Sequence, residues 1–339
     1  MPSPSLLATL IDERGVLLAD GATGTNLFAA GLVSGEAPEL WNADHPDRIR
    51  ALHQSFVDAG TDLLLTNTFG GTAPRLKLHD AANRVGELNE RAAVLANEVA
   101  DRAERRPLVA GSVGPTGELF EPLGTLTPNE AIAAFTDQIR GLKAGGVDMV
   151  WIETMSAPEE IRAAAQSAID VGVPYCFTGS FDTAGKTMMG LEPAEIHGVC
   201  AELDTPPVAL GANCGVGAPD ILASLLDMSA AQTATPLIVK GNCGIPQFKG
   251  TDIVYSGTPE LMASYAGLAI NAGASIVGGC CGTTPAHVAA MRSAIDNHTP
   301  DARPDIDHVT AVLGALVNNT ASASKKVKPT RGRRRRRRR

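Results

Sequence analysis

The sequence predicts a protein of the α/β class, a single-domain (β/α)8 TIM barrel. Short apolar runs recur eight times along the chain, and each is followed by turn residues and a helical pattern. Their spacing of roughly 26 to 47 residues is typical of strand-plus-helix units. Because the runs are almost continuously apolar, we expect parallel strands buried on both faces. The expected strands are residues 16–20, 63–69, 108–114, 149–155, 175–181, 209–214, 237–243 and 275–281.

A chain of 339 residues is long enough for one such barrel. We expect residues 1–310 to form it, and residues 311–339 to hold the remnant of a C-terminal helix and a disordered tail rich in lysine and arginine. The alternative is a doubly wound open sheet. The usual nucleotide-binding fingerprint of that fold is missing, because residues 111–117 have the wrong glycine spacing and carry Pro115 where a helix would begin.

Several helix ends are marked in the sequence. Residues 127–130, TPNE, have the pattern of a capping box with proline in the first turn, and Pro259 and Pro285 repeat the proline signal. Gly145 is expected to end the helix that begins near residue 128. A further helix is expected over residues 194–203.

Composition excludes several classes of protein. No apolar run approaches the ~20 residues of a membrane span, and the first residues lack the charged start and long apolar region of a signal peptide. The six cysteines lack the paired spacing of a disulfide framework, which suits a reducing compartment. We therefore expect a cytoplasmic protein without a membrane partner. The sequence is compatible with a homo-oligomer.

The formal net charge of -8 conceals an uneven distribution. Residues 325–339 carry eleven lysines and arginines and no acidic residue. This tail has almost no apolar side chains to bury, so we expect it to be disordered. A basic run can bind phosphates non-specifically. Because it has no interleaved aromatic residues, we expect no specific nucleic-acid partner.

The most informative stretch is residues 275–285, SIVGGCCGTTP. Neighbouring side chains of a regular strand point to opposite faces, but the glycines around Cys280 and Cys281 allow the backbone to turn both sulfurs the same way. Adjacent cysteines seldom reach the geometry of a relaxed disulfide, whereas two converging thiolates suit zinc or another soft metal. The alternative is a pair of buried cysteines acting as small apolar side chains. Cys214 ends another apolar run and is the candidate third ligand.

The motifs GANC (residues 211–214) and GGCCGTTP (residues 278–285) resemble the zinc site of the homocysteine S-methyltransferase family. This family includes betaine–homocysteine methyltransferase and the homocysteine module of cobalamin-dependent methionine synthase. The resemblance extends over about residues 10–300. It implies that Cys214, Cys280 and Cys281 bind Zn²⁺ and form the catalytic centre, with a fourth position open for the thiol of homocysteine. We assign none of the seven histidines to the metal, and expect Cys243 to be either a spectator thiol or core packing.

The same resemblance implies the contacts of the substrate. Asp20 and Glu153 each close an apolar run, which is costly unless the carboxylate is paired, and would bind the amino group of homocysteine. Backbone amides of the turn at Gly21 and Ala22 would hold its carboxylate. The remaining pocket residues would be Thr68 and Phe69 in residues 66–69, residues 114–117, and Asn242, which would approach the zinc when substrate is absent.

The implied reaction is attack of the homocysteine thiolate on an activated methyl group, which yields methionine. A free thiol has a pKa of about 8.5, whereas a metal-bound thiol is deprotonated. We favour glycine betaine as the donor, since the chain has no room for the pterin and cobalamin modules of methionine synthase. Trp41, Phe69 and Phe120 are the candidate aromatic contacts for its quaternary ammonium group.

Two further donors remain open. Gly70 and the motifs TNTFGGT and VGPTGELFEPLG look closer to the methionine synthase module, so the chain could be the homocysteine-activating subunit of a split enzyme, with a methylcorrinoid on a partner protein. S-methylmethionine is the third donor. The competing non-enzymatic hypothesis is a barrel with a closed structural zinc and a nucleic-acid-binding tail. It requires a fourth protein ligand.

Overall fold

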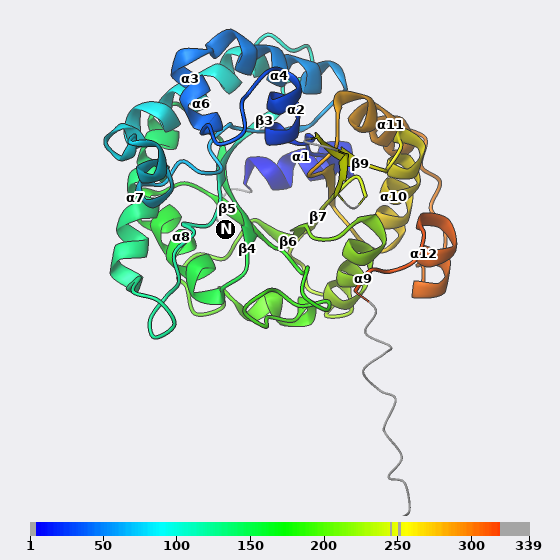
Figure 1. Ribbon diagram of the computed structural model, residues 1–339. Coiled ribbons are helices and arrows are strands. Elements are labelled where there is room, and N and C mark those ends of the chain that lie inside the picture. Colours follow the sequence, from blue (N-terminus) through cyan, green and yellow to red (C-terminus); the bar gives the residue numbers. More distant parts are fainter. Residues whose placement is uncertain (1–4, 245, 250–251, 319–339) are drawn as a thin grey trace, which may run out of the picture.

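The eight expected strands form one closed sheet. The computed structural model describes residues 5–244, 246–249 and 252–318. All neighbouring strands pair in parallel in the order β1-β10-β7-β6-β5-β4-β3-β2, and a bridge between Ala19 and Leu63 joins the two ends. This barrel, ringed by helices (Figure 1), confirms the predicted fold class. The barrel strands are β1 (Leu17–Leu18), β2 (Leu63–Leu65), β3 (Leu108–Val113), β4 (Met149–Met155), β5 (Tyr175–Gly179), β6 (Ala209–Cys214), β7 (Leu237–Gly241) and β10 (Ile276–Gly279).

Helices cover the outer face of the barrel. The predicted start of α7 is confirmed: the Thr127 hydroxyl accepts from the Glu130 N–H, and the Glu130 carboxylate accepts from the Thr127 N–H. The starts predicted at Pro259 and Pro285 are also confirmed. The longer helices are α1 (Leu6–Arg14), α2 (Thr23–Ala29), α4 (Pro46–Asp58), α6 (Val85–Ala100), α7 (Pro128–Ala144), α8 (Pro158–Val171), α9 (Ala218–Ser229), α10 (Pro259–Asn271), α11 (Pro285–Asp296) and α12 (Ile306–Leu313), and the short ones include α3 (Trp41–Asp44) and α5 (Ala73–Leu76).

The connection between β5 and β6 differs from the prediction. The helix expected over residues 194–203 is instead a 3₁₀ helix, η4 (Pro193–Gly198), and the buried Cys200 lies in the turn that follows. The Glu195 N–H bonds to the carbonyl of Glu192, three residues earlier. Gly198 is a poor helix former, and η4 ends at this residue.

Most of the buried apolar side chains belong to two cores. One lies between the strands and the outer helices, and the other fills the barrel with inward-facing side chains such as Trp151 and Cys176. Leu7 and Leu10 of α1 belong to this inner core, so α1 closes the end of the barrel at which the strands begin. The end at which the strands finish is thereby left as the accessible mouth.

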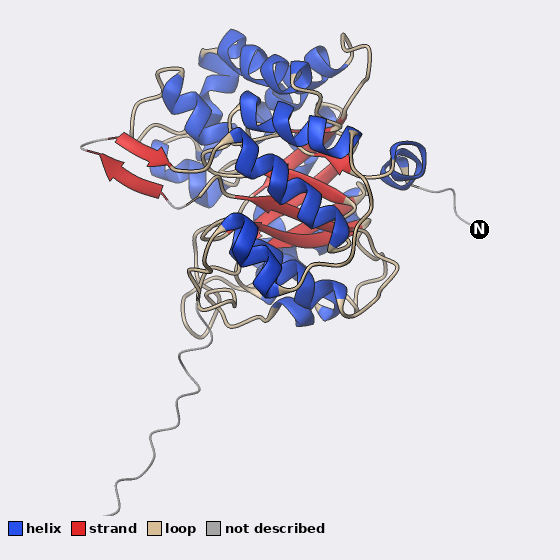
Figure 2. Cartoon of the chain, turned by 90° about the vertical axis from the view of Figure 1, so that its right-hand side faces the viewer, coloured by secondary structure: helices blue, strands red, loops and turns tan. Residues whose placement is uncertain are grey.

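A two-stranded hairpin, β8 (Pro246–Lys249) and β9 (Asp252–Tyr255), follows β7. Figure 2 shows it projecting at the end of the barrel opposite α1. None of the helices in the described part of the chain has both the length and the apolar character needed to cross a membrane. The predicted basic tail at residues 325–339 lies outside the described residues.

Candidate active site

Three cysteines meet at the mouth of the barrel. Cys214 ends β6, and Cys280 and Cys281 directly follow β10; β7 lies between these strands in the sheet. Their sulfurs all lie within 4.8 Å of one another, and those of Cys214 and Cys281 are 4.0 Å apart. Tetrahedral zinc with Zn–S bonds of about 2.3 Å needs sulfurs about 3.8 Å apart. The group therefore matches the spacing of a single thiolate-bound metal ion.

The backbone at these cysteines departs from regular strand geometry. Cys214 has a φ of 64° and Gly282 a φ of 80°. A positive φ is uncommon outside glycine, and such backbone strain gathers at functional sites. At Gly282 a Cβ atom would lie 2.2 Å from Cγ of Tyr255, so only glycine fits beneath that ring. At these two residues, which lie beside the sulfurs, the backbone turns away from the direction of the strand.

Two asparagines support the cysteines. Asn242, just after β7, accepts a hydrogen bond from the Cys281 N–H at 2.9 Å, and its amide nitrogen lies 3.6 Å from the Cys214 sulfur. The amide nitrogen of Asn213 lies 3.8 Å from the Cys280 sulfur and donates to the Thr154 hydroxyl at 2.7 Å. Outer contacts of this kind orient metal ligands. Sequence reasoning missed Asn213, although a polar residue before the cysteine of an apolar run was a usable signal.

The sulfurs share protons unequally. Hydrogen bonds from Cys280 and Cys281 lower the pKa of the Cys214 thiol. The pKa values of the Cys280 and Cys281 thiols are raised, chiefly by their hydrogen bonds with Cys214. A metal bound by all three sulfurs would release the protons that these thiols carry.

Cys243 lies outside this group. Its sulfur is 3.1 Å from Nε2 of His287 and is almost fully buried, and burial raises its thiol pKa to about 11. The Cys243 N–H donates to the Cys281 carbonyl at 2.9 Å, so Cys243 packs behind a candidate ligand. Within the described residues, no fourth Cys, His, Asp or Glu joins the three-cysteine group.

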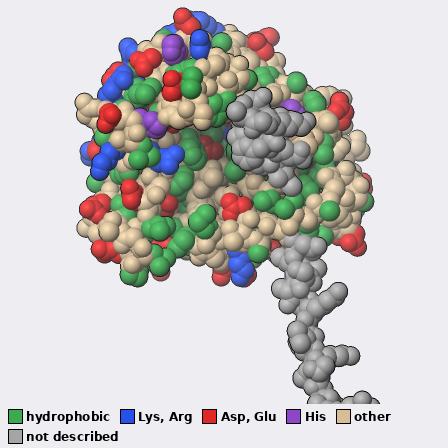
Figure 3. Space-filling view, viewed as in Figure 1, with side chains coloured by type: hydrophobic (Ala, Val, Ile, Leu, Met, Phe, Trp, Pro, Cys, Tyr) green, Lys and Arg blue, Asp and Glu red, His purple; other side chains and the backbone are tan. Residues whose placement is uncertain are grey.

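A pocket of about 570 Å³ opens above the cysteines. Figure 3 shows this face of the molecule hollowed at its centre. The pocket is large enough for an amino acid and part of a second small molecule. Among the predicted site residues, the lining includes Gly21, Ala22, Thr68, Phe69, Glu153, Cys214, Cys280 and Cys281; it also includes Phe28, Lys240 and Tyr255.

Other predicted residues lie elsewhere. Residues 114–117 do not line the pocket, because Thr116 turns to the buried Glu160, whose carboxylate accepts from its N–H and hydroxyl at 2.8 and 2.6 Å. Of the three aromatic residues predicted for the donor, Phe69 lines the pocket but Trp41 and Phe120 do not. Trp41 is buried, with the Arg48 guanidinium 4.8 Å from its ring centroid. The proposed donor contacts of Trp41 and Phe120 are therefore wrong.

The predicted acids face different surroundings. Glu153 lines the pocket and accepts from the Ser112 hydroxyl at 2.5 Å, and burial raises its pKa to about 7. Asp20 lies below the lining: one oxygen is 2.7 Å from Nζ of Lys240, and the other accepts from the Leu65 N–H at 2.8 Å. Sequence reasoning missed Lys240, although, like Glu153, it is a charge at the end of an apolar run.

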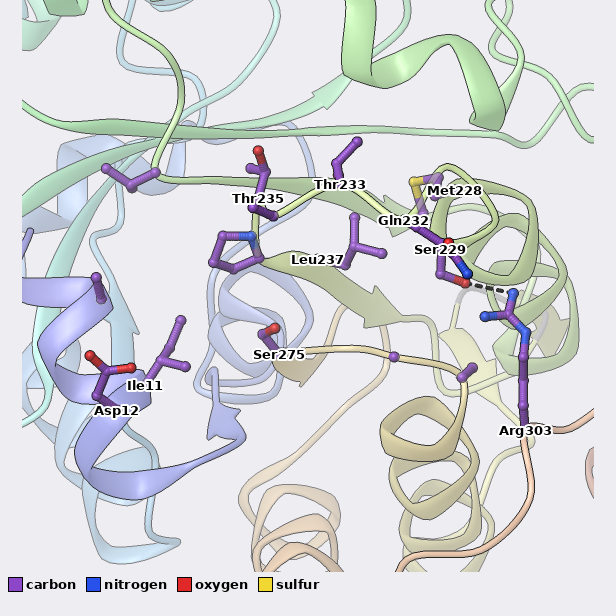
Figure 4. A pocket seen from close by; sticks show the side chains of 16 residues that line it. Ile11, Asp12, Met228, Ser229, Gln232, Thr233, Thr235, Leu237, Ser275 and Arg303 are labelled. Carbon is purple, nitrogen blue, oxygen red and sulfur yellow. Dashed lines mark hydrogen bonds between the residues drawn. The ribbon is translucent and has the colours of Figure 1, made fainter.

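A second cavity, of about 550 Å³, lies at the opposite end of the barrel. Figure 4 shows it between Asp12 of α1, Ser275 before β10, and Arg303, whose guanidinium donates to Ser229 at 2.8 Å. Its lining in the described chain includes no cysteine or histidine. Chemistry in this fold is found at the carboxyl ends of the strands, so the cavity over the cysteines is the candidate active site.

The fold is a (β/α)8 barrel, and its site combines three neighbouring thiols with a pocket large enough for a small substrate. This combination is typical of an enzyme. The chain belongs to the homocysteine S-methyltransferase family, whose model matches residues 17–295. It is 30% identical over 308 residues to the methionine synthase of Mycobacterium tuberculosis, and 31% identical over 307 residues to that of Mycobacterium leprae. In both cases the match covers 86% of this chain but 25% of the relative, so the chain spans about a quarter of the length of these relatives.

A solved structure is similar over nearly its whole length. The metallated form of the homocysteine methyltransferase MmuM from Escherichia coli superposes with a TM-score of 0.71 and 26% identity, over 85% of this chain and 99% of that chain. The oxidised form of the same protein gives a TM-score of 0.70. Nearly all of that chain therefore matches the barrel described here.

Proposed function

We propose that the chain transfers a methyl group to the sulfur of homocysteine and so forms methionine, with Zn²⁺ held by Cys214, Cys280 and Cys281. The observation that carries the proposal is the group of three sulfurs within 4.8 Å at the floor of the pocket, in a chain of this family. Bound zinc supplies a Lewis acid that keeps the acceptor thiol deprotonated. A cytoplasmic location, which the cysteine usage predicts, belongs to the same proposal.

The residues of the chain would bind and orient the acceptor. Its ammonium group would pair with Glu153, which faces the pocket, and its carboxylate would accept from the Gly21 N–H of the turn after Asp20. The Ala22 N–H donates to the Thr283 carbonyl at 3.2 Å and would have to exchange that partner to take part. The role of Asp20 in binding the ammonium stays a prediction, because Asp20 is paired with Lys240 and does not line the pocket. Asn242 would hold Cys281 in place.

Glycine betaine is the proposed methyl donor. Phe28 and Phe69, both partly exposed, line the pocket together with Tyr255. Aromatic faces attract a quaternary ammonium by ~0.5–2 kcal/mol each. Moving a methyl group from that nitrogen to a thiolate leaves a neutral amine, so the rings bind the donor more tightly than the product.

A methylcorrinoid on a partner protein is the second candidate, favoured by the similarity to methionine synthases four times the length of the matched region. Apolar side chains at the loops after the strands, including Leu119, Leu123 and Met188, are exposed and could contact such a partner. S-methylmethionine remains the third donor.

The test has two parts. Homocysteine added to the zinc-loaded protein should create a new Zn–S bond of about 2.3 Å in zinc-edge X-ray absorption. A panel of glycine betaine, S-methylmethionine and methylcobalamin, each with homocysteine, then identifies the donor by the methionine formed. An unchanged metal spectrum would refute the proposal and support a structural zinc site.

A further inference from the structure

Lys240 is a buried cation within the pocket that the metal group does not use. It is 2% exposed, lies near the end of β7, and lines the pocket beside Glu153 and Cys280. Its Nζ is 2.7 Å from Asp20 and 5.4 Å from the centroid of the Trp151 ring. Although burial opposes its charge, the carboxylates of Asp20 and Glu153 raise its pKa.

The neighbouring strand makes room for this side chain. On β10, a Cβ at Gly278 would lie 2.9 Å from Cγ of Lys240 and 2.9 Å from Cβ of Ala19. Real Cβ atoms essentially never make contacts this short, so any larger residue at position 278 would displace the lysine. Packing inside the barrel therefore fixes the position of the Lys240 side chain, whereas a lysine side chain at the surface would be flexible.

Lys240 already supplies the positive charge that Asp20 needs. Asp20 uses one oxygen for Lys240 and the other for the Leu65 N–H. An acceptor ammonium that approached Asp20 would meet the ammonium of Lys240, and like charges placed together in a site shielded from water are strongly disfavoured. The pocket lining also includes Glu36, Glu39, Arg75 and His79. Lys240 and Glu153 are the charged lining residues that interact with Cys280, so they are the pair that an acceptor bound at the cysteines would meet.

We propose that Lys240 determines acceptor specificity. Because it neutralises Asp20 from within the protein, the acceptor does not need an α-ammonium group, and the enzyme also methylates ω-mercapto carboxylates that lack one. This inference rests on the proposed function, since the thiol would bind at the same three cysteines. The acceptor sulfur forms a bond to the methyl carbon as the carbon–nitrogen bond of glycine betaine breaks; the products are an S-methyl thioether and dimethylglycine, and the thiol proton passes to solvent.

The experiment compares homocysteine with 4-mercaptobutanoate, which has the same thiol chain and carboxylate but no amino group. Binding to the zinc-loaded full chain is measured by calorimetry, and the thioether product by mass spectrometry. In the unaltered protein homocysteine should bind at most about tenfold more tightly, which is the contribution of its ammonium group at Glu153. In K240M the ratio should shift at least about tenfold toward homocysteine, because two carboxylates then lack an internal cation and only homocysteine brings one.

Two controls define the role of the charge. K240R retains a cation and should keep the original ratio, and K186M removes an exposed lysine paired with Glu192 at the surface and should also leave it unchanged. If K240M fails to fold in a thermal unfolding assay, K240Q, whose amide can still donate to Asp20, provides the same comparison.

The outcomes separate this inference from the proposed function. If the protein binds homocysteine but excludes 4-mercaptobutanoate by more than about a hundredfold, or if the ratio is the same in K240M, the inference is wrong and the methyltransferase function stands. If neither thiol binds at the zinc, both are wrong.

Discussion

The Asn242 side chain accepts a hydrogen bond from the Cys281 N–H at 2.9 Å, and its nitrogen lies 3.6 Å from the Cys214 sulfur. One residue after β7 therefore touches both cysteine-bearing strand ends, which are 67 positions apart in the chain. The same nitrogen donates to the Gly215 carbonyl at 2.6 Å, so both ends of the amide are engaged. Asn242 therefore keeps Cys214 and Cys281 at a fixed separation.

Asn242→Ala should therefore weaken zinc binding about 10–100-fold without abolishing it, because loss of an outer contact leaves the ligands present but less well oriented. Competition with a chelator of known affinity measures the change. Asn297→Ala is a matched control, since the Asn297 amide donates only within the end of α11, to Ser293. An Asn242→Ala protein with unchanged zinc affinity would show that the asparagine does not organise the site.

Cys281→Ala should lose zinc and methyl transfer together, because two thiolates and a neutral methyl group cannot complete the site. Metal content after dialysis is measured by atomic emission and compared with turnover. Cys200→Ala removes a thiol that is buried in the turn after η4, away from the site, and should retain one zinc per chain. Full zinc occupancy in Cys281→Ala would remove this residue from the ligand set.

Glu153 predicts a pH effect on acceptor binding. Burial raises its pKa to about 7, so the carboxylate becomes neutral below that pH and loses its attraction for an ammonium. The homocysteine affinity of the unaltered protein relative to Glu153→Gln should therefore fall about tenfold between pH 8 and pH 6. Ionisation of the acceptor thiol affects both proteins alike, so the ratio of affinities isolates Glu153. A ratio that stays constant over this range would mean that Glu153 does not bind the ammonium.

Gly282→Ala should damage the site through the backbone. A φ of 80° costs an alanine ~1–2 kcal/mol, and its Cβ would overlap the Tyr255 ring. The free energy of unfolding in urea should fall by about 2 kcal/mol or more, and zinc affinity should fall with it.

Gly267→Ala in α10 is the matched control for this glycine. No heavy atom lies within 4 Å of a Cβ built at position 267, and alanine is favoured over glycine in a helix by ~1 kcal/mol. This variant should be as stable as the original or more so. If the two variants behaved alike, the turn after Cys281 would not need glycine.

Removal of residues 325–339 should leave turnover intact, because every residue assigned to the site lies between positions 20 and 281. Turnover of the shortened and full chains is compared with homocysteine and the active donor at low and high salt. The full chain alone should bind a phosphate-rich polyanion in a salt-dependent way. A large loss of turnover would give the tail a part in catalysis.

The sequence alone determined the fold class and the meeting of the three cysteines. Eight apolar runs at strand-plus-helix spacing require a parallel sheet, and the carboxyl ends of parallel barrel strands share one face. Cys214, Cys280 and Cys281 each stand at such an end, so their proximity follows from topology without knowledge of any side-chain contact. Local signals for helix starts, such as Thr127 with Glu130, were reliable because a capping box is formed by residues only three positions apart.

Only the tertiary structure decided which side chains pair inside the barrel. Asp20 and Lys240 are 220 positions apart, and their contact depends on strand register and on the space left at Gly278. Trp41 likewise packs within the core between strands and helices and lies outside the pocket lining. Local residue preferences specify elements and their ends, whereas the partner of a buried charge is set by long-range packing, which no short stretch of sequence contains.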